Sequence, residues 1–150
     1  MNANTLHPHS LATTIQQMYR LMLQYIPDVQ NLGWRTVADV FNAVRAVPYT
    51  EDGAAHECLG AGECVKRPGL TLALGGDCDD KVILAGAGLA SLGVPSRIVT
   101  TSYRPDGEFQ HTYLEVFLEG RWWPFDATYP ENQLFTEAPY TRKQVWPRNQ

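Results

Sequence analysis

The feature that most constrains this chain is a cysteine between acidic residues, directly after two glycines and directly before a helical pattern. The segment reads Gly75-Gly76-Asp77-Cys78-Asp79-Asp80. The alanine- and leucine-rich run from Asp79 to Leu92 ends at Gly93, a residue typical of the position after a helix C-terminus. The pattern therefore predicts Cys78 in the first turn of a helix.

The first turn of a helix favours a thiolate, because unpaired N–H groups and the helix dipole stabilise negative charge there. Asp77, Asp79 and Asp80 oppose this effect at Cys78, although they suit the helix end itself. A reactive thiolate here would need a cationic partner such as an imidazolium. Without one, Cys78 would be a small buried residue beside a helix cap.

The composition indicates one globular domain spanning residues 1–150. A chain of 150 residues with 44% hydrophobic residues can build one core but not two ordinary domains. The net charge of −4, without a basic run, argues against nucleic acid as a partner. No apolar run approaches the roughly 20 residues that a membrane helix needs, and residues 1–10 do not resemble a signal peptide, so we expect a cytoplasmic protein without a membrane partner.

Two amphipathic helices are predicted within residues 10–47. Ser10 is a candidate N-cap for the first, and Thr36, with Asp39 as the acid of a capping box, opens the second, which must end before Pro48. The apolar residues at helical spacing are assigned to the core. They are Leu11, Ile15, Met18, Met22 and Tyr25 in the first helix and Val37, Val40, Phe41 and Val44 in the second.

The segment 49–74 lacks periodicity, which is typical of a lid or a cleft wall. It contains His56, Cys58 and Cys64, whose spacing fits no standard zinc-ligand pair, so neither a metal nor another cofactor is predicted. Cys58 and Cys64 could form a disulfide, but nothing in the sequence requires one. The lack of a signal peptide favours a reducing compartment.

Strands are predicted after the central helix, at 96–103, 110–118 and 121–127, with a turn at 104–107. Pro124 cannot donate to a ladder, so the third strand belongs at a sheet edge. The proline-rich residues 131–150 are expected to form a tail that wraps the surface. If Glu119-Gly120 is the hairpin loop, Tyr113 lies opposite Asp126.

This hairpin register puts His111 and Asp126 diagonally on one face, within ~7–8 Å at Cα. A slip of one residue would separate them. A carboxylate at this distance can hold one imidazole nitrogen and leave the other to accept a proton from the Cys78 thiol. Cysteine, histidine and aspartate together supply what acyl transfer by a thiol requires: a nucleophile, an acid–base group and an orienting acid.

Four segments resemble the transglutaminase-like superfamily, a branch of the papain-like cysteine fold. They are Gly-Asp-Cys-Asp-Asp, Leu-Gly-Val-Pro-Ser-Arg-Ile-Val, His-Thr-Tyr-Leu-Glu-Val and Trp-Trp-Pro-Phe-Asp-Ala-Thr, within about residues 48–130. The resemblance implies an α+β fold, in which a helix bearing the cysteine packs on an antiparallel sheet bearing the histidine and the aspartate. By the same resemblance, Cys78 is the nucleophile, His111 the base and Asp126 the orienting acid.

The segment 63–68 and the doubled acid after Cys78 look most like small bacteriophage or prophage members of the superfamily. This likeness implies a bacterial host cell or a virion as the location, and phage structural proteins as further candidate partners. The sequence departs from papain-like enzymes in having no glutamine shortly before Cys78 to serve as an oxyanion donor. The backbone N–H of Cys78 and the Tyr49 hydroxyl are the candidate donors instead.

Tyr113 and Trp122 are the candidate cleft residues, and no calcium-loop spacing is present. The expected function is thiol-dependent acyl transfer on a protein or peptide substrate, with hydrolysis of a peptide or isopeptide amide favoured. One alternative is a catalytically silent phage assembly module with the same fold. Another is a protein-glutamine deamidase or a transglutaminase.

Overall fold

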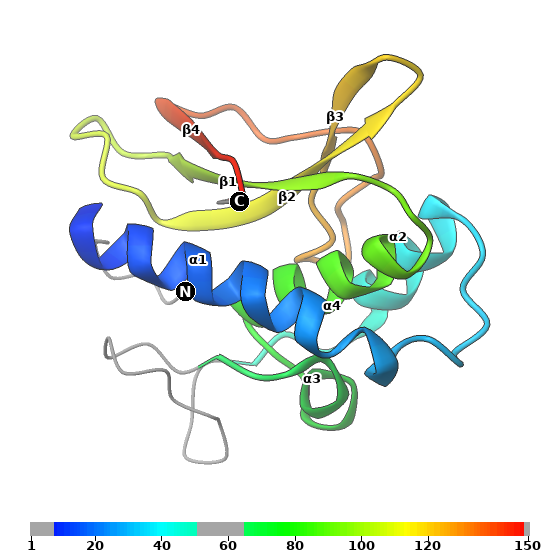
Figure 1. Cartoon of the computed structure of the whole chain (residues 1–150). Helices are drawn as coiled ribbons and strands as arrows, with labels where there is room; N and C mark the ends of the chain where they lie inside the picture. The colour runs from blue at the N-terminus through cyan, green and yellow to red at the C-terminus, as the bar shows by residue number, and fades with distance from the viewer. Residues whose placement is uncertain (1–7, 51–64, 149–150) are drawn as a thin grey trace.

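The helix that begins at Cys78 lies at the centre of the fold (Figure 1). A computed structural model describes residues 8–50 and 65–148. In it, α4 spans Cys78–Ser91, and its residues from 78 to 89 are all buried. Helices α1 (Pro8–Gln24), α2 (Val37–Ala46) and α3 (Pro68–Leu74) pack against α4, and the sheet covers a further side of it. A helix that is enclosed in this way needs apolar residues all round, which explains its weak amphipathic pattern.

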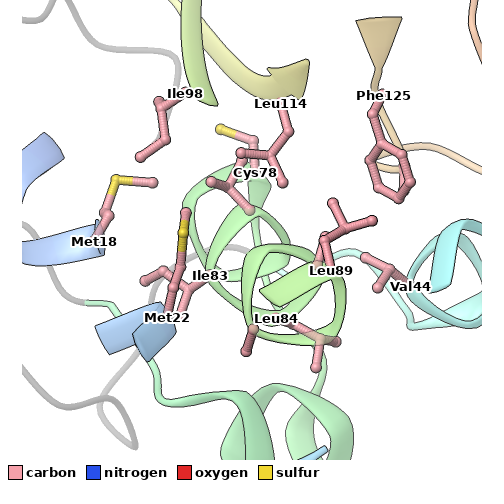
Figure 2. Packing of buried hydrophobic residues seen from close by; sticks show 14 of the residues in the cluster. Met18, Met22, Val44, Cys78, Ile83, Leu84, Leu89, Ile98, Leu114 and Phe125 are labelled. Atoms are coloured by element: carbon pink, nitrogen blue, oxygen red, sulfur yellow. The ribbon is translucent and has the colours of Figure 1, made fainter. Parts of the chain in front are cut away.

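Two glycines allow neighbouring side chains to approach α4 closely. A Cβ at Gly86 would lie 2.3 Å from Met22 Sδ, and one at Gly88 would lie 2.8 Å from the Trp34 ring. Figure 2 shows how Met22 of α1 and Leu114 of β2 converge on α4 from different sides. The predicted core residues of the first two helices are buried as expected, except that Tyr25, just after α1, and Val37 are only partly buried.

The sheet has four antiparallel strands in the order β3-β2-β1-β4. The strands are β1 (Ser96–Ser102), β2 (His111–Leu118), β3 (Arg121–Phe125) and β4 (Arg142–Trp146). Strand β3 lies at an edge, as Pro124 requires. Leu114 and Val116 point into the core that the sheet shares with the helices.

The predicted hairpin register is confirmed. Leu118 pairs with Arg121 and Leu114 with Phe125, so the loop is Glu119-Gly120. Both loop residues have positive φ, 52° at Glu119 and 80° at Gly120, as a tight two-residue hairpin turn demands. Continuing this register past Phe125 places Asp126 diagonally from His111 on the same face of the hairpin.

Part of the segment predicted to be irregular forms α3. A proline at its first position pre-sets the helical φ, so this seven-residue helix begins without a long periodic run. The Asp28 carboxylate holds this helix start, accepting hydrogen bonds from the Arg67 side chain at 2.7 Å and from Gly69 N–H at 2.9 Å. His56, Cys58 and Cys64 lie outside the described residues.

The predicted C-terminal tail contributes a strand. After β3 the chain crosses to the far edge of the sheet, where β4 pairs with β1 (Figure 1). The Tyr19 hydroxyl of α1 bonds both strands of this pair, accepting from Ile98 N–H and donating to the Trp146 carbonyl. Within residues 8–50 and 65–148, no helix combines the length and the apolar character needed to span a bilayer.

Candidate active site

Cys78 is the first residue of α4, and a capping box fixes this end of the helix. Asp77 is the N-cap: its side chain accepts a hydrogen bond from Asp80 N–H at 3.2 Å, while the Asp80 side chain accepts one from Asp77 N–H at 3.1 Å. This reciprocal pair satisfies two helix-end donors. The prediction that Cys78 lies in the first helical turn is confirmed.

The glycine pair before the cysteine brings a second segment to the site. Gly75 has φ +83°, and a Cβ there would lie 2.7 Å from the Pro48 carbonyl oxygen, so only glycine fits. Gly76 N–H donates to that same carbonyl at 3.1 Å, and Thr50 N–H donates to the Gly76 carbonyl at 3.0 Å. Tyr49, which lies between these two contacts, is thereby held beside the start of α4.

A buried lysine neutralises one of the acids near Cys78. Lys66 Nζ lies 3.0 Å from Asp80 Oδ2, and Lys66 N–H donates to Asp80 Oδ1 at 2.8 Å. Both side chains are almost fully buried. Burial and the nearby Asp77 carboxylate nevertheless raise the pKa of Asp80, against the opposing effect of Lys66. Asp80 thus joins the helix cap to the chain before α3.

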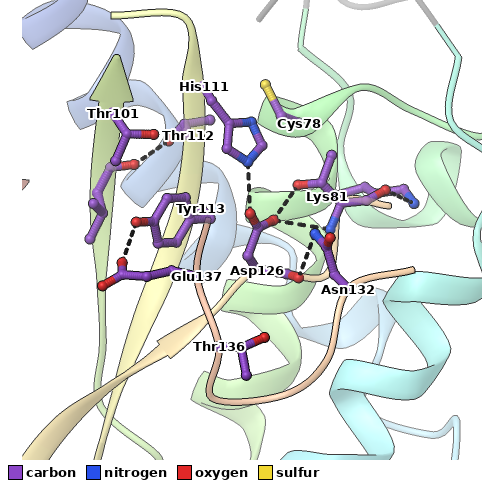
Figure 3. Close-up of polar contacts among 12 residues, drawn as sticks. Cys78, Lys81, Thr101, His111, Thr112, Tyr113, Asp126, Asn132, Thr136 and Glu137 are labelled. Carbon is purple, nitrogen blue, oxygen red and sulfur yellow. Dashed lines mark hydrogen bonds and ion pairs between the residues drawn. The ribbon is translucent and has the colours of Figure 1, made fainter. Parts of the chain in front are cut away.

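His111 and Asp126 form a direct contact. His111 Nε2 lies 2.8 Å from Asp126 Oδ2, and both side chains are buried. The Cys78 thiol hydrogen-bonds with the His111 ring, and in Figure 3 the sulfur faces the ring nitrogen that does not contact Asp126. The structure therefore brings together the three residues that the sequence analysis selected, in the order thiol, imidazole, carboxylate.

Thr128 holds the other oxygen of the carboxylate. Its hydroxyl and its N–H both donate to Asp126 Oδ1, at 2.7 Å and 3.2 Å. Burial would raise the pKa of Asp126, but the hydrogen bonds from His111 and Thr128 outweigh it and keep the pKa below its usual value of 3.8. Asp126 is therefore a carboxylate at neutral pH.

Contacts with Asp126 and Cys78 keep the His111 ring protonated. Burial alone would lower the pKa of His111, but the bonds to Asp126 and Cys78 raise it to about 10. The ring is thus an imidazolium at neutral pH, which is the cationic partner that the sequence analysis required. It offsets the nearby Asp79 carboxylate, whose Oδ1 lies 4.0 Å from Cys78 Sγ.

A cavity of about 660 Å³ opens above these residues. Cys78, His111 and Asp126 are among the residues that line it. Two half-exposed tyrosines flank the imidazole within the cavity: the Tyr103 and Tyr129 rings lie 6.1 Å and 6.0 Å from the His111 ring, centre to centre. The remaining lining residues include Arg104, Gln110, Glu131, Asn132, Thr136, Glu137 and Ala138.

The other residues selected from the sequence take different places. Tyr49 lines the cavity, with its ring 5.3 Å from that of Tyr129. Tyr113 is buried beside His111, with ring centres 5.5 Å apart, and its hydroxyl donates to Glu137 (Figure 3). Tyr113 thus packs behind the imidazole and is not part of the cavity wall.

The expectation that Trp122 lines the cleft is wrong. Its ring packs under the Arg97 guanidinium at 4.1 Å and beside the Phe117 ring at 5.2 Å. Trp122 pairs with Phe117 near the turn of the hairpin, six residues along β2 from His111. At ~3.3 Å per residue, this puts Trp122 about 20 Å from the imidazole, although both residues lie on the same face.

Sequence reasoning missed Thr128, Lys81 and Tyr129. The spacing of Asp126 and Thr128 is a detectable signal, because an aspartate often accepts a hydrogen bond from the backbone N–H two residues later. A lysine within an apolar helical run is a second signal, because such a lysine needs a buried partner. In the structure, Lys81 Nζ donates to the Thr128 carbonyl at 2.8 Å. Among the residues that the structure describes, no group of three or more His, Cys, Asp or Glu is arranged to hold a metal ion.

A family model and one solved structure match this chain. A sequence model of the transglutaminase-like superfamily matches residues 35–127, a range that includes Cys78, His111 and Asp126. The fold is similar to that of a candidate cysteine protease from Cytophaga hutchinsonii, with a TM-score of 0.50 and 17% sequence identity. The match covers 87% of this chain and 55% of that one. A comparison with curated proteins gives no match.

Proposed function

Because this chain belongs to the transglutaminase-like superfamily, we propose that it is an enzyme that cleaves peptide or isopeptide amides through a thioester at Cys78. The observation that carries this proposal is the contact of a buried thiol with an imidazole whose other nitrogen lies 2.8 Å from a carboxylate. The raised pKa of His111 supports it, because a thiolate is stabilised beside an imidazolium.

In the proposed reaction, the Cys78 thiolate attacks the amide carbonyl and forms a tetrahedral oxyanion. The backbone N–H of Cys78, at the start of α4, is one proposed donor to this oxyanion, and the Tyr49 hydroxyl is the second. The His111 imidazolium then protonates the departing amine, which leaves a thioester and a neutral imidazole. Asp126 keeps the ring oriented throughout.

Hydrolysis completes the proposed cycle. The neutral His111 takes a proton from water, the resulting nucleophile attacks the thioester, and the acid product leaves as the thiolate–imidazolium pair re-forms. We favour water over an amine as the acceptor because the cavity above Cys78 opens to solvent. Incubation with a peptide amide and a primary amine, followed by mass spectrometry, separates the two: hydrolysis yields the acid, and transfer yields the amine adduct.

The nucleophile is tested by covalent labelling with a peptide vinyl sulfone, read by intact mass. Wild-type protein should gain one adduct, and Cys78→Ala should gain none. Cys58→Ala and Cys64→Ala are the matched controls, since each removes a different thiol and should leave labelling intact. Equal labelling of all three variants, or none of the wild type, would contradict the proposed function and favour a silent module that keeps the fold.

A further inference from the structure

Lys81 is a buried cation with no part in the reaction proposed above. Its side chain is 2% exposed, and it lies three residues after Cys78, on the same side of α4. An ammonium group is rarely buried unless it is paired, because desolvation costs more than an isolated contact returns. The position of Lys81 therefore calls for a specific partner.

The contacts of Lys81 lead to the imidazole in three steps. Lys81 Nζ donates to the Thr128 carbonyl oxygen at 2.8 Å. Thr128 in turn donates its hydroxyl and its N–H to Asp126 Oδ1, at 2.7 Å and 3.2 Å. Asp126 Oδ2 lies 2.8 Å from His111 Nε2. All four side chains are buried, so water competes little for these bonds.

These contacts form a closed series of interactions that begins and ends on α4. His111 contacts Cys78 at the start of α4, and Lys81 leaves the same helix one turn later. A rigid helix fixes the separation of its own residues, so the bond from Lys81 sets where the end of the β2–β3 hairpin lies relative to the thiol. Figure 3 shows Lys81 and Cys78 on the same side of Asp126.

We propose that Lys81 is a positioning residue, which anchors the 126–128 segment to α4 so that Asp126 holds the His111 ring against the Cys78 thiol. The effect of Lys81 on catalysis rests on the proposed function, whereas its effect on the position of Asp126 does not. Lys81 would act as a hydrogen-bond donor and not as a positive charge. Its removal should shift the His111 pKa in opposite directions in these two cases.

Loss of the anchor would lower the pKa of His111, because a displaced carboxylate stabilises the imidazolium less. Loss of a nearby positive charge would raise it instead. Burial lowers the pKa of Lys81 to about 8, although Asp126 opposes the shift, so the amine is largely neutral where His111 titrates, near pH 10. A neutral amine still donates to Thr128, so the anchor persists there while the charge does not.

The test is an NMR titration of the His111 ring in wild-type and Lys81→Met protein, which needs neither substrate nor turnover. We expect the His111 pKa to fall by about one unit or more in the variant, and kcat to fall ~10–100-fold with little change in KM. An unchanged or raised His111 pKa in folded Lys81→Met protein would overturn the proposal.

Lys66→Met is the matched control, because it removes the other buried lysine near α4 and destabilises the fold without touching the 126–128 segment. It should leave the His111 pKa unchanged; an equal fall in both variants would show general loosening and overturn the proposal. If Lys81→Met does not fold, Lys81→Asn decides: its polar side chain is two atoms shorter and loses the bond to the Thr128 carbonyl, so the His111 pKa should again fall, and an unchanged pKa would overturn the proposal. Failure of vinyl sulfone labelling would contradict the proposed function but not the role of Lys81, because the His111 titration does not depend on labelling.

Discussion

Two aspartates near Cys78 are both buried, yet their pKa values shift in opposite directions. Asp80 is fully buried and its pKa is raised, mainly by desolvation and by the neighbouring Asp77. Asp126 is almost as deeply buried, but hydrogen bonds from His111 and Thr128 overcome the effect of burial and lower its pKa. Burial alone therefore does not decide the charge of a carboxylate at this site.

The difference lies in the partners. Asp80 accepts bonds from Lys66 and from the backbone N–H of Asp77, and so joins two parts of the chain at the helix cap. Asp126 instead contacts a ring that can itself take up or release a proton. We infer that Asp80 serves mainly the fold and Asp126 mainly the reactivity of the site, so substitutions at the two positions should have different effects.

The largest effect is expected for Asp126→Asn. An amide has no negative charge to stabilise the imidazolium, and it can hold the ring in the wrong tautomer, so kcat should fall on the order of 10³–10⁴-fold. Steady-state kinetics on a cleaved peptide, with circular dichroism as the check on folding, measures this. A variant that kept more than about a tenth of wild-type kcat would remove Asp126 from the proposed mechanism.

Lys66→Met should act on stability rather than on chemistry. It leaves the Asp80 carboxylate buried without its ammonium partner, which typically costs about 3–5 kcal/mol. Urea unfolding would measure the loss, and the activity per folded molecule should stay within a few-fold of wild type. Adding Asp80→Leu to Lys66→Met should recover part of the stability. A loss below about 1 kcal/mol would mean that the pair contributes little.

The smallest effect is expected in the pH dependence of unfolding, where the two aspartates should show opposite signs. The lowered pKa of Asp126 gives stability that is present above pH 3.8 and lost as pH falls through the folded-state pKa. The raised pKa of Asp80 gives a contribution to the free energy of unfolding that is fully present below pH 3.8 and is lost as pH rises through its folded-state pKa.

Urea unfolding of wild-type, Asp126→Asn and Asp80→Asn protein between pH 3 and pH 7 would reveal these signs. As the pH falls, the advantage of wild type over Asp126→Asn should shrink, whereas the stability of wild type relative to Asp80→Asn should increase. If both differences moved in the same direction, the contrast between the two carboxylates would be wrong.

Much of the site was predictable because its determinants are local in sequence. The two-residue loop Glu119-Gly120 fixes the hairpin register, and the register alone places His111 near Asp126. Likewise, glycines, a capping acid and an apolar run predict where the helix of Cys78 begins. Each of these features depends on neighbours within one hairpin or one helical turn.

The remaining features depend on packing between distant elements. The contact of Lys81 with Thr128 joins positions 47 residues apart, and no local pattern encodes it. Strand β4 was missed because five half-exposed residues in a proline-rich segment carry little periodicity; only pairing with β1 makes them a strand. The place of Trp122 was predicted wrongly because alternation gives the face of a sheet but not the position along it.

The most direct test of the account is the rate at which Cys78 reacts with iodoacetamide at pH 7, followed by mass spectrometry of the peptide that contains it. Wild-type Cys78 should react about ten times faster than Cys78 in His111→Ala protein, because a thiol beside an imidazolium is the more reactive one. Equal rates in the two proteins would contradict the account, since they would mean that the thiol and the imidazole do not act as a pair.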